Sequence, residues 1–147
     1  TLILSILALA TSARLIIMDE PTQHLDPASR HELIYLIKQY VNENGGTILL
    51  SSHEIFELEE YATSFAIIKN GKILYTDTID DAKHKHRIVR LNENTRGAKI
   101  VAVIDDEILV KTDEDIGEYP RLNQIIVGYL KGTQEEPVTG GVQLASE

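Results

Sequence analysis

Two short apolar runs that flank an amphipathic segment constrain the fold of this chain most strongly. The runs are residues 15–18 and 47–51, and neither alternates between apolar and polar side chains. Such runs are typical of strands that are covered on both faces. The segment between them repeats its apolar residues at the helical period, so a strand, a helix and a strand follow one another. Because a crossover of this kind joins parallel strands, we expect both strands to run in the same direction.

The helix between the two runs has recognisable start and stop signals. Asp26 suits the capping position and Pro27 suits the first helical position. After Asn44, a pair of glycines can adopt the left-handed conformation that ends a helix. The apolar positions of this helix fall on one face, which we expect to pack in the core; they are Leu33, Leu36, Ile37, Tyr40 and Val41.

The charge and the cysteine content exclude some classes of protein. The 147 residues hold 23 Asp and Glu against 14 Lys and Arg, which gives a net charge of −9. This excess of acidic residues argues against non-specific binding to nucleic acid, which needs clustered basic side chains. The chain has no Cys, so it has no disulfide framework and no thiolate metal site, and this fits a reducing compartment.

The apolar N-terminal region resembles neither a secretory signal nor a membrane span. No basic stretch precedes residues 1–18, and Arg14 interrupts them. A signal needs the basic stretch, and a spanning helix needs about 20 apolar residues without a charge. We therefore expect a buried helix at residues 2–10, a short break and then the first strand.

The sequence after residue 51 predicts a smaller mixed lobe. Asn70-Gly71 between two apolar segments is typical of a tight hairpin turn. The elements expected are a short helix at 54–62, a hairpin at 65–75, a helix or linker at 80–86, a strand at 87–91, a hairpin at 99–111 and a helix at 120–131. Residues 134–147 hold few apolar side chains, so we expect a disordered tail there.

Polar side chains follow both predicted strands. Asp19 and Glu20 come directly after the first strand, and Ser51, Ser52 and His53 end the second. Parallel strands bring these residues to one edge of the sheet, where ligands bind in open α/β folds. One carboxylate can hold Mg²⁺, directly or through water, and the other can orient or deprotonate an attacking water. A neutral His can hydrogen-bond a terminal phosphate or that water.

Three motifs, in order and at matching spacing, resemble those of the ATP-binding cassette (ABC) ATPases. They are the Walker B strand with its catalytic acid at residues 15–22, the D-loop at Leu25-Asp26-Pro27 and the switch-His loop at Ser51-Ser52-His53. The resemblance covers about residues 1–76. The remainder resembles, less specifically, the C-terminal extension of drug- and bacteriocin-exporter ATPases of this family.

The resemblance implies a role for each matched residue. Asp19 would hold the water shell of Mg²⁺, Glu20 would be the general base, and His53 would contact the γ-phosphate of ATP. Leu25 and Asp26 would lie at the interface between two ATPase subunits. Where the family usually has Ser-Gly before Leu-Asp, this chain has Gln23-His24, which puts the contacts across that interface in question.

The resemblance also implies a fold and its divisions. We expect an α/β protein with a partial P-loop NTPase-like parallel sheet and a small α+β C-terminal lobe. The expected segments are the C-terminal part of a nucleotide-binding domain at 1–80, the small extension at 81–132 and the disordered tail at 133–147. The chain lacks the G-x-x-x-x-G-K-[ST] phosphate loop and the family's Gly-rich signature, so we expect it to be inactive alone.

The function implied is that of an energy-coupling ATPase of an ABC transporter, of exporter type. Its cofactors would be ATP and Mg²⁺, and its partners a second ATPase subunit, identical or different, and an integral membrane permease. No nucleic acid is expected, and the location would be cytoplasmic, peripheral on the inner face of the cell membrane.

Other interpretations stay open at this point. A soluble ABC-like ATPase of DNA maintenance or translation shares the acid pair, the Leu-Asp loop and the His. A non-catalytic docking or regulatory fragment is the alternative from a different class, with residues 87–131 as its docking lobe. At the residue level, Asp19 and Glu20 can be a solvated strand end, and His53 can make a structural hydrogen bond only. The basic cluster around His84 and His86 suits a solvated linker, or else a contact with a membrane surface or nucleic acid.

Overall fold

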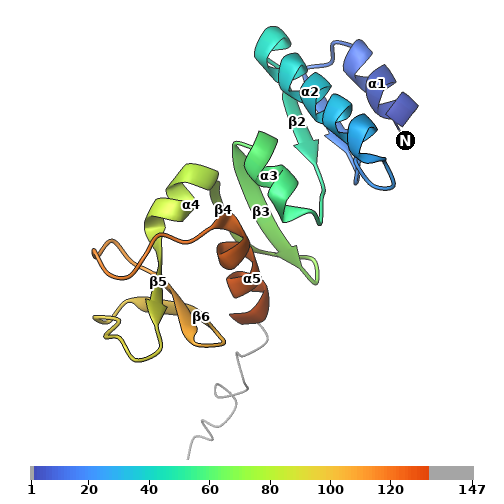
Figure 1. The fold of residues 1–147 in the computed structure, drawn as a ribbon. Helices are drawn as coiled ribbons and strands as arrows, with labels where there is room; N and C mark the ends of the chain where they lie inside the picture. Colours follow the sequence, from blue (N-terminus) through green and yellow to red (C-terminus); the bar gives the residue numbers. More distant parts are fainter. Residues whose placement is uncertain (1, 133–147) are drawn as a thin grey trace, which may run out of the picture. The chain divides into compact units, whose positions relative to one another are not determined.

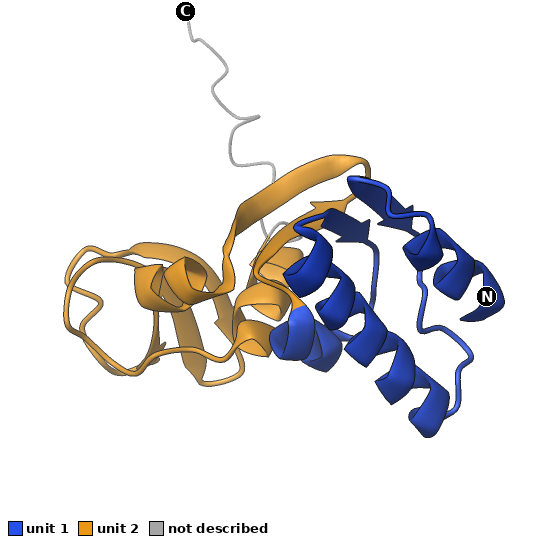
Figure 2. Cartoon of the chain, turned by 90° about the horizontal axis from the view of Figure 1, so that it is seen from above, with its two compact units in different colours: residues 1–61 blue, residues 62–147 orange. Residues whose placement is uncertain are grey.

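The chain folds into two compact units, which are described separately. The computed structural model describes residues 2–132. The first unit comprises residues 1–61 and the second begins at Ala62 (Figure 2). The first unit contains a parallel sheet and the second contains antiparallel sheets, so the predicted α/β class with a mixed C-terminal lobe is confirmed. Within the described residues, no helix is both long enough and apolar enough to cross a membrane.

The first unit has the predicted strand–helix–strand order (Figure 1). Strand β1 pairs in parallel with strand β2, with Leu15 opposite Thr47 and Met18 opposite Leu50. Its elements are α1 (Leu2–Ala10), β1 (Leu15–Met18), α2 (Pro27–Asn44), β2 (Thr47–Leu50) and α3 (Ile55–Tyr61).

Helix α2 begins and ends at the residues that the sequence indicates. The Asp26 carboxylate accepts hydrogen bonds from the backbone N–H groups of Ala28 and Ser29, and Pro27 takes the first turn. Gly45 adopts a left-handed conformation with φ of 61°, and its N–H donates to the carbonyl oxygen of Val41. Asp26 and Gly45 thus satisfy backbone groups that a helix leaves unpaired at its two ends.

One face of the β1–β2 sheet packs against α2. Ile16 and Met18 contact a cluster on the helix that includes Leu33, Ile37 and Tyr40. The predicted core stripe is wrong at one position, because Val41 is 39% exposed. Ile34 is buried instead, and it lies one turn before the buried Ile37 on the same side of the helix.

The other face of this sheet is open, which differs from the prediction that both faces are covered. Leu15, Ile17 and Leu49 are 56%, 70% and 61% exposed. Their burial alternates along β1, as it does in a strand with a helix on one face only. The apolar runs therefore carry more apolar surface than the described residues cover.

The second unit opens with a hairpin. Strand β3 (Ser64–Lys69) pairs with β4 (Lys72–Thr78), with an irregularity at Ile67 and Ile68. At the turn, Asn70 has φ of 51° and Gly71 has φ of 74°. Positive φ at both central residues is the geometry of the tight turn that the Asn-Gly pair predicts.

A three-stranded antiparallel sheet and two helices complete the second unit. The sheet has the order β5-β7-β6. The sequence predicts a helix or a linker at residues 80–86, and most of this segment is helical. Thr78 caps the helix, because its hydroxyl accepts a hydrogen bond from the Asp81 N–H. The elements are α4 (Ile79–Lys85), β5 (His86–Arg90), β6 (Lys99–Ile104), β7 (Glu107–Lys111) and α5 (Leu122–Gly132).

Helix α5 joins the hairpin to the three-stranded sheet. Its Gly128 lies so close to Leu109 of β7 that an added Cβ would stand 2.4 Å from a Leu109 methyl carbon. On the hairpin side, Lys69 donates to the Leu130 carbonyl oxygen at 2.8 Å, and Tyr75 stacks on Tyr129. The hairpin thus packs with the C-terminal lobe.

The predicted division at residues 80 and 81 falls inside the second unit. The segment boundaries at 1–80 and 81–132 stay a prediction about functional domains. The predicted tail at 133–147 lies outside the described residues.

Candidate active site

The parallel pairing brings the ends of β1 and β2 to one edge of the sheet, as predicted. The Ser51 N–H continues the ladder by donating to the Met18 carbonyl oxygen at 3.0 Å. After Met18 the chain turns sharply, and Glu20 has φ of 45°, which is unusual for a residue with a side chain. A strained backbone at such a position is often found at functional sites.

Ser51 ties the two strand ends together. Its hydroxyl donates to Oδ1 of Asp19 and accepts from the backbone N–H of Glu20 at 2.9 Å. The side chain that directly follows β2 thereby fixes both acids that follow β1. The sequence predicts that Ser51 lies at this edge but assigns it no role, although its place beside the acids is a signal for one.

His53 lies directly against Glu20. Its Nδ1 is 2.9 Å from Oε2 of Glu20, and because a carboxylate accepts, the ring nitrogen donates. The Glu20 side chain is 29% exposed and that of His53 is 61% exposed, so both remain accessible to a ligand. The hydrogen bond and the negative charge of Glu20 raise the pKa of His53, with a smaller contribution from Glu54. The structure therefore brings Asp19, Glu20 and His53 together.

Leu25 and Asp26 occupy a separate place at the start of α2. Leu25 is half-buried against the core of the first unit. The Asp26 carboxylate accepts from the backbone N–H of Ala28 at 3.0 Å and of Ser29 at 3.1 Å, and also from the Ser29 hydroxyl. These bonds, the Ser29 hydroxyl first, lower the pKa of Asp26. The local role of Asp26 is to cap the helix, and its predicted role between subunits stays a prediction.

The residues at this edge suit a hydrated cation. No group of three or more His, Asp or Glu side chains in the described part of the chain is arranged to hold a metal. Mg²⁺ usually keeps several waters and needs only one or two carboxylates beside substrate phosphates. Asp19 is exposed, and its Oδ1 is held by Ser51. The donor set fits Mg²⁺ bound through water, whose charge would offset that of a phosphate group.

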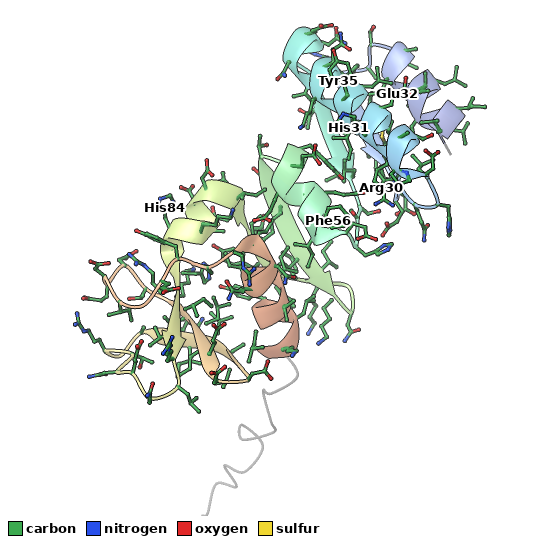
Figure 3. The ribbon with its side chains drawn as sticks, viewed as in Figure 1. Arg30, His31, Glu32, Tyr35, Phe56 and His84 are labelled. Atoms are coloured by element: carbon green, nitrogen blue, oxygen red, sulfur yellow. The ribbon has the colours of Figure 1, made fainter. Side chains whose placement is uncertain are left out.

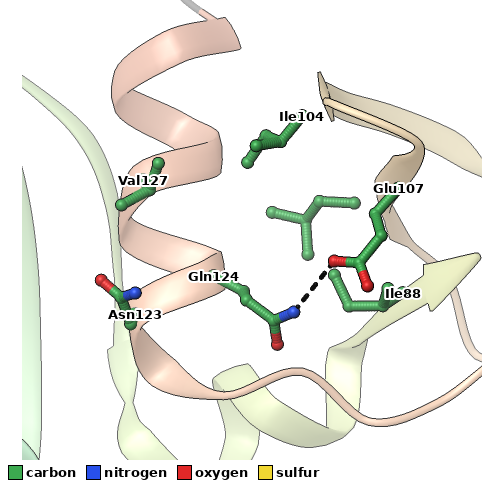
Figure 4. A pocket seen from close by; sticks show the side chains of 7 residues that line it. Ile88, Ile104, Glu107, Asn123, Gln124 and Val127 are labelled. Carbon is green, nitrogen blue, oxygen red and sulfur yellow. Dashed lines mark hydrogen bonds between the residues drawn. The ribbon is translucent and has the colours of Figure 1, made fainter.

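A hollow lies away from these residues, in the second unit. It has a volume of about 110 Å³ between α5 and the three-stranded sheet (Figure 4). Gln124 donates to Glu107 across its mouth at 3.1 Å. None of the residues that the sequence predicts for the site lines this hollow; its lining is Ile88, Ile104, Glu107, Leu109, Asn123, Gln124 and Val127.

Comparison with known proteins identifies the class of protein that this chain resembles. Over about half of the chain, its homologues are ATP-binding proteins of ABC transporters. The sequence model of an AAA domain family, described as "AAA domain, putative AbiEii toxin, Type IV TA system", matches residues 1–59. The predicted resemblance is thus confirmed over about half of the chain.

Individual relatives match about half of the chain. The chain is 36% identical over 70 residues to the energy-coupling factor transporter ATP-binding protein EcfA2 of Lacticaseibacillus paracasei, which is 48% of this chain and 24% of that protein. It is 33% identical over 82 residues to the thiamine import ATP-binding protein ThiQ of Vibrio parahaemolyticus, which is 56% of this chain and 35% of that protein. The chain therefore spans about a quarter to a third of the length of these relatives.

A solved structure of an ATP-binding subunit of an ABC transporter is also similar. The sequence identity is 31% and the TM-score is 0.49, over 55% of this chain and 33% of that chain.

Proposed function

We propose that this chain carries part of the catalytic site of an ABC-type transport ATPase. The observation that carries the proposal is the contact between His53 and Glu20, at 2.9 Å, beside Asp19. Two separate strand ends supply these groups, and homologues over about half of the chain are ABC transporter ATP-binding proteins. The cofactors would be ATP and Mg²⁺.

The geometry supports a distinct task for each side chain. Glu20, hydrogen-bonded through one carboxylate oxygen, would accept a proton from the attacking water through the other. With its raised pKa favouring the form protonated on both ring nitrogens, His53 would donate from Nδ1 to Glu20 and from Nε2 to the γ-phosphate. Asp19 would bind the water shell of Mg²⁺, which neutralises phosphate charge, and Ser51 would keep both acids in place.

This site needs groups that the 147 residues do not contain. The chain has no phosphate-loop motif, and it spans about a quarter of the length of EcfA2. We propose that a phosphate loop in a longer protein and a second ATPase subunit, the latter reached through Leu25 and Asp26, complete the site. The assembly would work with an integral membrane permease, at the cytoplasmic face of the cell membrane.

The direction of transport is a finer proposal. The exporter type rests on the loose likeness of the C-terminal segment alone. The names of the relatives describe an energy-coupling factor transporter, thiamine import and methionine import, so these relatives give the exporter type no support.

ATP turnover by two preparations tests the proposal. We expect the protein translated from the complete reading frame to hydrolyse Mg-ATP, and the purified 147 residues to bind ATP weakly and to hydrolyse none. Turnover by the 147 residues alone would show that the site does not depend on a phosphate loop. A complete protein that neither binds nor hydrolyses ATP would favour the non-catalytic docking fragment.

A further inference from the structure

A buried carboxylate lies behind the candidate active site. Glu57, in the first turn of α3, is fully buried. Its Oε2 accepts a hydrogen bond from the hydroxyl of Thr22 at 2.8 Å, and Thr22 is 2% exposed. Burying a charged group costs free energy unless it is paired and hydrogen-bonded, so a site of this kind is retained only where its partners are fixed.

The second oxygen of this carboxylate faces a cation on another helix. Arg30, in the first turns of α2 (Figure 3), has its Nε at 3.2 Å from Oε1 of Glu57. The two atoms are close enough for an ion pair, although their orientation does not form a hydrogen bond. One turn further along α3, burial and the negative charge of Glu57 raise the pKa of the Tyr61 hydroxyl. Glu57 thus contacts two other segments, through Thr22 and Arg30.

The places of these partners in the chain connect them to the site. Thr22 lies two residues after Glu20, and Glu57 lies four residues after His53. Arg30 lies four residues after Asp26. One buried carboxylate therefore joins the loop that carries the acid, the helix that Asp26 caps and the helix that directly follows His53.

We propose that Glu57 is a positioning residue, which fixes the distance between Glu20 and His53 by holding Thr22 and Arg30. The inference rests on the proposed function, because it names how that site is kept in shape. Glu57 itself does not contact substrate. Its effect on catalysis passes through the two segments that it holds, and a displacement of ~1 Å at a catalytic group can lower a rate by on the order of a hundredfold.

Thr22→Val tests the proposal most directly. The change removes the hydrogen bond to Glu57, keeps the shape of the side chain and leaves every charge in place. In the protein translated from the complete reading frame, we expect kcat for ATP to fall about tenfold while KM changes by less than about twofold. Thr22→Ser keeps the hydroxyl and should restore the wild-type kcat.

A spectroscopic measurement separates positioning from simple stabilisation. The contact with Glu20 requires the proton of neutral His53 on Nδ1, and the ¹⁵N shifts of a labelled imidazole report which nitrogen carries it. We expect the folded Thr22→Val protein to lose the tautomer with the proton on Nδ1 of His53. A protein without ATPase activity still gives this readout, so failure of the proposed function and failure of this inference are distinguishable.

Two further variants complete the test. Glu60→Gln breaks an exposed ion pair with Lys38 between the same two helices, at 3.6 Å, and should leave kcat and the His53 tautomer unchanged. If Thr22→Val does not fold, Glu57→Gln, which can still accept from Thr22 but loses the charge that faces Arg30, should show the same losses in kcat and tautomer. The proposal would be overturned by a folded Thr22→Val protein that keeps the wild-type kcat and the wild-type His53 tautomer, even if its stability were lowered. If Thr22→Val does not fold, the same result for a folded Glu57→Gln protein would overturn it.

Discussion

At the scale of single residues, His53 and His86 lie in opposite environments. His53 is exposed beside carboxylates, which raise its pKa. His86 is fully buried, with Nδ1 at 2.7 Å from the Ala82 carbonyl oxygen and Nε2 at 2.8 Å from the Tyr129 hydroxyl. Because a carbonyl only accepts, Nδ1 of His86 donates to Ala82. Burial lowers the pKa of His86, which favours the neutral ring, and in that form Nε2 accepts from the Tyr129 hydroxyl.

His86 should make the stability of the second unit depend on pH. Burial lowers its pKa below the ordinary value of 6.5, so the unfolded chain takes up the proton first. Its contribution to stability is present above the unfolded pKa and is lost as pH falls through the lowered, folded pKa. We expect the free energy of unfolding, measured in urea by tyrosine fluorescence, to decrease from about pH 7.5 to about pH 5.5.

The control for this prediction is His86→Gln. Glutamine does not titrate, so the part of the pH slope that belongs to His86 should disappear in this variant. Lys111, Lys85 and Asp77 also act on His86, and they are unchanged in both proteins. An equal slope in the two proteins would assign the pH dependence to other groups.

The sequence patterns identify the candidate catalytic residues but not the residue proposed to hold them in position. Asp19, Glu20 and His53 could be predicted because each directly follows an apolar strand, and the parallel pairing then brings them together. Glu57 could not, because it lies in a short acidic helix and its importance depends on burial against Thr22, which only the packed structure shows. The same holds for the open face of the sheet, since strand burial depends on what the neighbouring elements cover.

At the scale of elements, the ends of α2 depend on few residues. The Asp26 carboxylate satisfies two backbone N–H groups that the helix cannot. It also accepts from the Ser29 hydroxyl. These bonds hold the first turn of the helix directly after the loop that carries Glu20.

Replacing Asp26 should weaken this helix. We expect Asp26→Ala to lower the free energy of unfolding by about 1 kcal/mol, the usual cost of losing a helix cap, as measured by urea denaturation. Asp26→Ser keeps a capping oxygen and should recover most of the loss. Equal stability of the Ala variant and the wild type would show that the cap is not needed here.

The edge of β5 depends on a glycine. Gly117 has φ of 54°, and a Cβ at this position would stand 2.0 Å from the Ile88 carbonyl oxygen. The next residue, Glu118, makes two backbone hydrogen bonds with Ile88, at 2.8 and 2.9 Å. A side chain at Gly117 would push this bridge apart.

Gly117→Ala should therefore destabilise the second unit. We expect a loss of about 2–3 kcal/mol in urea denaturation, from the backbone strain and the broken bridge together. Gly97→Ala is the matched control: Gly97 has φ of 77° with open space around it, so it should cost only about 1 kcal/mol. Similar losses at both glycines would mean that the contact with Ile88 adds nothing.

At the scale of the whole molecule, the chain combines one edge of the proposed catalytic site with much exposed apolar surface. Ile17 and Leu49 are exposed on the sheet, and Ile3 and Leu4 of α1 are 73% and 71% exposed. Large exposed apolar patches usually mark places where other protein packs. The chain spans about a quarter of the length of EcfA2, and we propose that the activity belongs to a longer protein.

The central claim is that Glu20 is the general base, and Glu20→Gln in the complete protein tests it most directly. Glutamine keeps the shape of the side chain but cannot take a proton, so ATP should still bind while steady-state hydrolysis falls by at least about a hundredfold. Glu54→Gln, which removes the other carboxylate near His53, at 3.7 Å, should retain most of the activity. Unchanged hydrolysis by the Glu20→Gln protein would contradict the account, because another residue would then be the base.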